Sequence, residues 1–190
     1  NYVCATGDRT AIVIEAKEGC IDENGIVTIP STIPVTLVEG EAAENYKVIA
    51  IEDNVFSGNT DIKAVKIGDN VKTIGVNAFQ GCTNLTKVWF PASLEEIGAK
   101  AFDECRSIAF ISTKRNTPID IKDVFSVYNK ATLYVPDEAA IESYMVDNLW
   151  KQFPIKRVGD FVDLTTQNDI TYECVIKGEG EAATYEAMVV

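Results

Sequence analysis

Phenylalanine recurs at a fixed interval along this chain, since Phe56, Phe79, Phe102 and Phe125 are each 23 residues apart. Other apolar positions keep the same interval, so the period belongs to a whole unit and not to one residue type. The remaining repeated core positions are Ile51, Ile74 and Ile97; Ile62, Leu85 and Ile108; Val65, Val88 and Ile111; and Cys82 and Cys105. A unit this short buries its apolar side only against neighbouring units, which predicts a solenoid.

Within each unit, apolar and polar residues alternate over a short run. In the clearest unit Val88 is expected to point inward, with Lys87 and Trp89 outward, as in a strand with one buried face. A proline ends this run, and prolines also end the runs at 26–30 and 132–136, which we expect to be the first and last strands of one parallel sheet. The coils are expected to turn at Gly68, Gly75 and Gly98.

Other patterns flank the repeats. Residues 1–47 hold apolar runs separated by Asn24-Gly25, a hairpin signal, and predict an N-terminal β cap with the first coil. Residues 48–158 hold the repeats and, at about 137–150, a helix that begins after Asp137 and caps the open end of the core. The apolar residues at helical spacing in that segment are Ile141, Tyr144, Met145 and Leu149.

Residues 159–190 form a C-terminal β segment that allows two interpretations. Tyr172-Glu173-Cys174 repeats the Tyr-x-Cys pattern of Tyr2-Val3-Cys4, and an Ala follows at a nearly equal offset, in 181–183 and at Ala11. The segment is either the start of a further array, which this chain does not complete, or a terminal β-hairpin packed on the last coil. Close packing against the helix at about 137–150 would favour the hairpin.

Charge and composition exclude several functions. The chain has 17 Lys+Arg, 29 Asp+Glu and no His, so its formal net charge is −12. Without His there is no Ser-His-Asp triad and no His-ligated zinc site. An acidic chain lacks the positive footprint that nucleic acid needs, and an anionic membrane surface repels it. The stretches without charged residues are too short for direct membrane insertion.

The repeated residues also resemble a known family. The units IGVNAFQGCTNLTKVWFPASL and IGAKAFDECRSIAFI are similar to the BspA-type leucine-rich repeat, whose pattern is roughly IGxxAFxxCxxLxxVxLPxxL. The resemblance covers 47–158 clearly and 25–34 more weakly. The chain departs from the pattern where Gly68 replaces the proline, where Asn59 replaces the cysteine, and in the blurred unit around Phe125.

The resemblance implies a leucine-rich-repeat solenoid: β-rich, with short parallel strands, a period of 23 residues and little helix apart from one short C-terminal helix. It also implies an extracellular or cell-surface bacterial protein with an adhesion or interaction role. Because the chain begins with Asn1, we expect removal of a signal peptide or lipoprotein leader. The family does not identify a partner.

Five cysteines, none in a C-x-x-C pair, are the first candidates for chemistry. Cys82 and Cys105 share one repeat column, so they are either a reduced buried pair or a disulfide between coils. A bridge between Cys4 and Cys20 is a further alternative, and with Cys174 the odd number leaves one thiol unpaired in a monomer. A nucleophilic Cys would need a base or a lowered pKa, and the chain has no His to serve as that base.

Carboxylates are numerous, but their positions follow no catalytic or metal-binding pattern. The Asp and Asn residues of the turns match no EF-hand loop, and Asx residues favour turns for their own backbone hydrogen bonds. We therefore expect no enzyme activity, no cofactor and no metal.

The outward face of the predicted sheet is the candidate binding site. Column registration places Lys66, Trp89, Ser112 and Tyr134 in one line and Ala64, Lys87, Phe110 and Thr132 in the next. Aromatic residues are enriched at binding hot spots, so this face is expected to bind a protein such as a host or extracellular-matrix protein. The alternatives are a carbohydrate-binding module, in which rings stack on a glycan, and a structural spacer. The face is not a binding site if a cap or loop covers it or if Phe110 turns inward.

Overall fold

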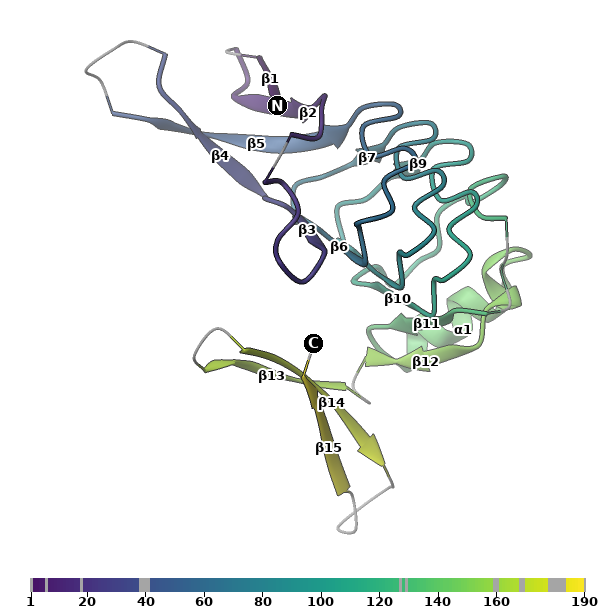
Figure 1. The fold of residues 1–190 in the computed structure, drawn as a ribbon. Coiled ribbons are helices and arrows are strands. Elements are labelled where there is room, and N and C mark those ends of the chain that lie inside the picture. Colours follow the sequence, from purple (N-terminus) through teal and green to yellow (C-terminus); the bar gives the residue numbers. More distant parts are fainter. Residues whose placement is uncertain are drawn as a thin grey trace.

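Two sheets line opposite sides of a solenoid in the computed structural model (Figure 1). The structure describes residues 2–5, 7–17, 19–37, 42–126, 128, 130–158, 161–167, 170–177 and 184–189, with the backbone alone for Val3, Ala5 and 161–189. In Figure 1 the coils stack one on another from the N-terminal strands to helix α1 (Glu138–Val146). The solenoid, with one short α-helix among the described residues, confirms the predicted fold class.

The first of these sheets contains the strands that the alternating runs predicted. Its order is β12-β11-β10-β8-β6-β3, and its strands are parallel. The strands are β3 (Ile26–Ile29), β6 (Ala64–Ile67), β8 (Lys87–Phe90), β10 (Phe110–Thr113), β11 (Thr132–Val135) and β12 (Ile155–Arg157). The prediction that 132–136 forms the last strand was wrong, because β12 returns after the helix and pairs with the free edge of β11.

The second sheet was not predicted from the sequence. It has the order β1-β2-β5-β7-β9, with β4 also paired to β5. Its strands are β1 (Tyr2–Ala5), β2 (Thr10–Val13), β4 (Thr32–Val35), β5 (Glu44–Ile51), β7 (Thr73–Ile74) and β9 (Glu96–Ile97). Two-residue strands such as β7 and β9 are too short for alternation to reveal, and they pair only because successive coils bring them into register.

The repeated phenylalanines stack on one another inside the solenoid. The ring centroids of Phe56 and Phe79 lie 5.0 Å apart, with an angle of 5° between the ring planes. Those of Phe79 and Phe102 lie 5.1 Å apart, with an angle of 6°. Phe125 continues the stack at 5.5 Å from Phe102. The other repeated positions are buried around this stack, including Ile51, Ile74, Cys82, Leu85, Val88, Ile97, Cys105, Ile108 and Ile111. Burial of one continuous core over successive coils holds the fold together.

Three glycines allow neighbouring coils to approach closely. A Cβ on Gly75 would lie 2.5 Å from the backbone nitrogen of Asp53, and one on Gly98 would lie 2.5 Å from that of Val76. Gly68 meets the backbone of the preceding coil in the same way. None of the three has a positive φ, so they are required by close packing and not by the turn conformation that the sequence suggested.

A short helical segment closes the C-terminal end of the solenoid. The Asp137 side chain accepts a hydrogen bond from the Ala140 backbone nitrogen, which makes Asp137 the N-cap of α1 as expected. Trp150, in the 3-10 helix η1 (Trp150–Gln152), is 1% exposed and donates to the Ile119 carbonyl over 2.6 Å. The assignment of Met145 to the apolar helix face was wrong, because its side chain is 60% exposed.

The C-terminal strands form a separate antiparallel sheet of β13 (Phe161–Gln167), β14 (Ile170–Lys177) and β15 (Thr184–Val189). The β14–β15 pair repeats the register of β1–β2: the equivalent pairs are Tyr2 with Val13 and Tyr172 with Val189, then Cys4 with Ala11 and Cys174 with Ala187. The Ala that matches Ala11 is therefore Ala187 and not one of 181–183. The shared register favours the interpretation of a further unit, which stays a prediction.

Candidate interaction face

Strand register brings the predicted line of outward residues together. Lys66 pairs with Trp89, Trp89 with Ser112, and Ser112 with Tyr134, all as direct neighbours in parallel strands. The second predicted line is also present, with the order Ala64, Lys87, Phe110 and Thr132. Every member is half-buried except Ala64, which is 6% exposed. We call these two lines and their continuations into β3 and β12 the interaction face.

Three aromatic rings pack against one another on this face. The ring centroid of Phe110 lies 5.3 Å from that of Trp89, with an angle of 49° between the ring planes. It lies 4.8 Å from that of Tyr134, with an angle of 26°. Phe110 belongs to the neighbouring line, but its ring reaches the space between Trp89 and Tyr134, where Ser112 has only a small side chain. Ile111 points into the core, so the alternative in which Phe110 turns inward is wrong.

The rings are turned toward each other instead of lying flat on the sheet. Two rings side by side in one plane do not bring their centroids to the 4.8 Å that separates Phe110 from Tyr134. Trp89 has Phe110 on one side and the Lys66 ammonium over its ring on the other, 5.5 Å from the centroid. This cation–π contact fixes the Lys66 charge at one end of the aromatic strip.

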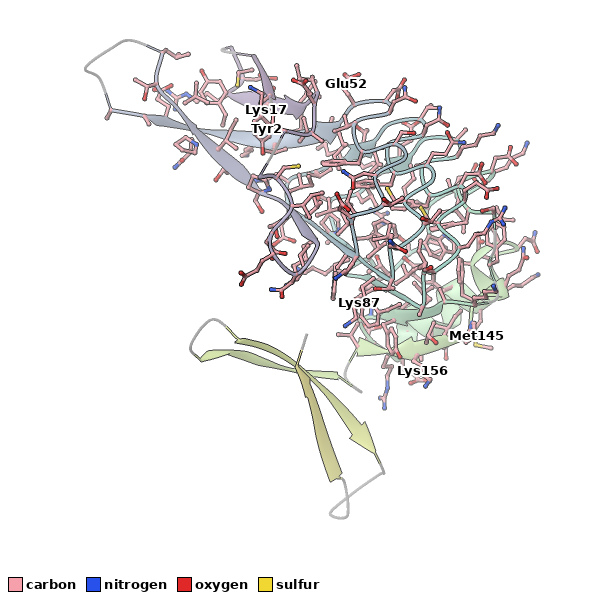
Figure 2. The ribbon with its side chains drawn as sticks, viewed as in Figure 1. Tyr2, Lys17, Glu52, Lys87, Met145 and Lys156 are labelled. Atoms are coloured by element: carbon pink, nitrogen blue, oxygen red, sulfur yellow. The ribbon has the colours of Figure 1, made fainter. Side chains whose placement is uncertain are left out.

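The face contains a lysine that the repeat columns did not reveal. Lys156 in β12 pairs with Tyr134 and extends the first line by one strand. Its spacing of 22 residues from Tyr134 equals the spacing of Tyr134 from Ser112, and this was the signal that would have found it. Lys87 and Lys156 lie on the same side of the solenoid in Figure 2, whereas Lys17 lies at its N-terminal end.

The cysteines whose side chains are described are free thiols, namely Cys4, Cys20, Cys82 and Cys105. Cys82 and Cys105 donate to carbonyls of the preceding coil, over 3.2 Å to Phe56 and 3.0 Å to Phe79. The neighbouring Cys82 thiol, together with burial, holds the pKa of Cys105 far above its ordinary value. A neutral buried thiol is a packing group and not a nucleophile. The side chain of Cys174 lies outside the described residues.

The described part of the chain lacks both a cluster of metal ligands and a membrane-spanning helix. It holds no group of three or more His, Cys, Asp or Glu placed to bind a metal ion. None of its helices has the length and apolar character needed to span a bilayer. The interaction face, with its packed rings and its cation–π contact, is therefore the candidate binding site.

Residues 44–150 match the BspA type leucine rich repeat region in six copies. A leucine-rich repeat protein from Bacteroides capillosus has a similar fold, with a TM-score of 0.55 and 21% identity over 72% of this chain and 93% of that one. The Treponema pallidum leucine rich repeat protein is 20% identical, with a TM-score of 0.47 over 83% of this chain, which spans 60% of the treponemal protein.

A leucine rich cell surface protein from Faecalibacterium prausnitzii is 16% identical, with a TM-score of 0.49 over 97% of this chain and 57% of its own length. No curated protein matches the sequence.

Proposed function

Because this chain belongs to the BspA-type leucine-rich repeat family, we propose that it is a non-enzymatic interaction module that binds a protein through the interaction face. The observation that carries the proposal is the strip of three mutually packed rings on a sheet face. Rings held by their neighbours lose little conformational freedom when a partner covers them, which is the property of a binding hot spot.

Ring orientation supports a protein partner over a glycan. A sugar platform needs ring faces turned outward and spaced to match successive sugar units. Here Phe110 and Tyr134 turn their faces toward each other, and Lys66 and Phe110 occupy both sides of Trp89. A protein surface, unlike a sugar ring, packs readily against recessed aromatic groups of this kind.

We further propose that the protein acts at the bacterial cell surface or outside the cell, after removal of a signal peptide or lipoprotein leader. Membership of the family supports this location. Protease treatment of intact cells tests it, since a surface protein is degraded while a cytoplasmic marker survives. Protection of the protein in intact cells, together with its absence from the medium, would contradict the proposal.

The binding experiment compares the chain with a Trp89→Ala/Tyr134→Ala variant on immobilised extracellular-matrix proteins and glycans. Met145→Ala/Val146→Ala is the matched control, because these apolar side chains are 60% and 79% exposed on α1. We expect the first variant to lose binding to a matrix protein and the control to keep it. Circular dichroism and thermal melting establish that both variants are folded.

The other outcomes are equally specific. Glycan binding that depends on Trp89 and Tyr134 would replace the protein partner by a carbohydrate. Binding that survives the double substitution would move the site off the interaction face. Failure to bind any immobilised protein or glycan would favour a structural spacer.

A further inference from the structure

The interaction face has a charge opposite to that of the whole molecule. The chain has a formal net charge of −12, yet the outward positions of β3, β6, β8, β10, β11 and β12 hold no Asp or Glu. They hold three lysines instead, Lys66, Lys87 and Lys156. The positive interaction face attracts an acidic partner, whereas the acidic remainder of the protein repels it.

Two of these lysines mark the ends of the aromatic strip. Lys66 and Lys156 belong to the same line, with Trp89, Ser112 and Tyr134 between them in adjacent strands. Four steps between parallel strands of about 4.8 Å each place the two lysine positions about 19 Å apart. An extended peptide advances about 3.3 Å per residue, so it covers this distance in about six residues.

We propose, building on the function proposed above, that the partner presents an extended acidic segment along this line. Two carboxylates about six residues apart pair with Lys66 and Lys156, and apolar side chains between them pack on the rings of Trp89, Phe110 and Tyr134. The aromatic contacts supply most of the affinity, while the two ion pairs set the position and the sign of the charge that is recognised.

Synthetic nine-residue peptides with a common apolar centre test the proposal by fluorescence anisotropy. One has Glu at its second and eighth positions, one has Lys at both, and a third has two Glu only three positions apart. We expect the first peptide to bind roughly tenfold more tightly than the other two, and its affinity to fall as salt is added.

A charge-reversal variant provides the decisive comparison. Lys66→Glu/Lys156→Glu is expected to bind the Lys-containing peptide better than the widely spaced Glu peptide, which reverses the preference of the unmodified chain. Lys17→Glu/Lys122→Glu changes the net charge equally at exposed positions outside the strands of the face and is expected to keep the original preference. Thermal melting of both variants shows that a change in binding is not a loss of folding.

The outcomes separate this inference from the function on which it rests. Equal binding of all three peptides that is lost in Trp89→Ala/Tyr134→Ala would overturn the acidic segment and keep the face as a binding site. Binding that persists in that variant would overturn both. Failure of every peptide to bind, while a matrix protein binds through the face, would also overturn the acidic segment.

Discussion

Asn77 donates a hydrogen bond from its side-chain amide to the side-chain oxygen of Asn54 in the preceding coil, over 3.1 Å. Both residues have left-handed backbones, with φ of 55° and 61°. Lys100 and Asp123 hold the same position in the next two coils, at 58° and 59°. Asn and Asp tolerate this conformation better than Lys. Among these four equivalent positions, Lys100 is therefore the residue least suited to its backbone conformation.

Substitution of Lys100 by Asn is therefore expected to stabilise the protein. We predict an increase of about 0.5–1 kcal/mol in the free energy of unfolding, measured by urea denaturation, because the left-handed conformation is strained for Lys. Lys122→Asn is the control, since Lys122 is exposed and has no positive φ. An equal change in both variants would contradict the role of the backbone conformation.

Gly75 is expected to tolerate no side chain. Its Cβ would lie 2.5 Å from the Asp53 backbone nitrogen, so Gly75→Ala forces two coils apart and is predicted to reduce the free energy of unfolding by about 2 kcal/mol. Gly7 has nothing within 4 Å of the corresponding position, and Gly7→Ala is predicted to change stability by less than about 0.5 kcal/mol. Similar melting temperatures for the two variants would refute the close-approach explanation.

Replacement by Phe is expected to affect stability differently at two buried tyrosines, Tyr46 and Tyr144. The Tyr46 hydroxyl is buried with no hydrogen-bond partner among the described residues, so Tyr46→Phe is expected to leave stability unchanged or to raise it by up to about 1 kcal/mol. Tyr144 donates to the Thr117 carbonyl over 3.1 Å, so Tyr144→Phe is expected to lower stability by about 1 kcal/mol. Calorimetry of the pair checks the difference, and a destabilised Tyr46→Phe would show that its hydroxyl has a partner.

The buried phenol of Tyr144 is also expected to make the protein less stable at alkaline pH. Burial raises the pKa of this phenol above the ordinary value of 10.0. Between the two values the unfolded chain releases this proton and the folded chain keeps it, so the free energy of unfolding falls as pH rises above 10. Denaturation at pH 8 and about pH 11 is expected to show a smaller fall for Tyr144→Phe than for the unmodified chain. Equal falls would place the effect on other groups, such as Tyr2 and Tyr128, whose pKa values burial also raises.

Much of the fold followed from columns of like residues. A 23-residue interval in Phe and Ile fixed the stacking of coils, and the alternation around Val88 fixed which side of β8 is buried. The second sheet could not be predicted, because β7 and β9 are two residues long and gain their pairing from the coils that carry them. Strand β12 was missed because a helix separates it from the other repeats.

The two central lines of the interaction face were predicted in their residues and not in their geometry. Register alone placed Trp89 and Tyr134 in one line, but it did not show that Phe110 fills the space beside Ser112 between them. Side-chain packing of this kind depends on the sizes of diagonal neighbours across strands, which a sequence without coordinates does not specify.

The fluorescence of the two tryptophans shows whether a bound partner covers the interaction face. Trp150 is 1% exposed inside the C-terminal end of the solenoid, whereas Trp89 is half-buried on the interaction face, so acrylamide quenching reports mainly on Trp89. Trp89→Phe measures the contribution of Trp150. We predict that a saturating protein partner reduces the quenching of the unmodified chain to the level of Trp89→Phe. Quenching that is unchanged by a bound partner would show that the partner binds elsewhere and would contradict the account.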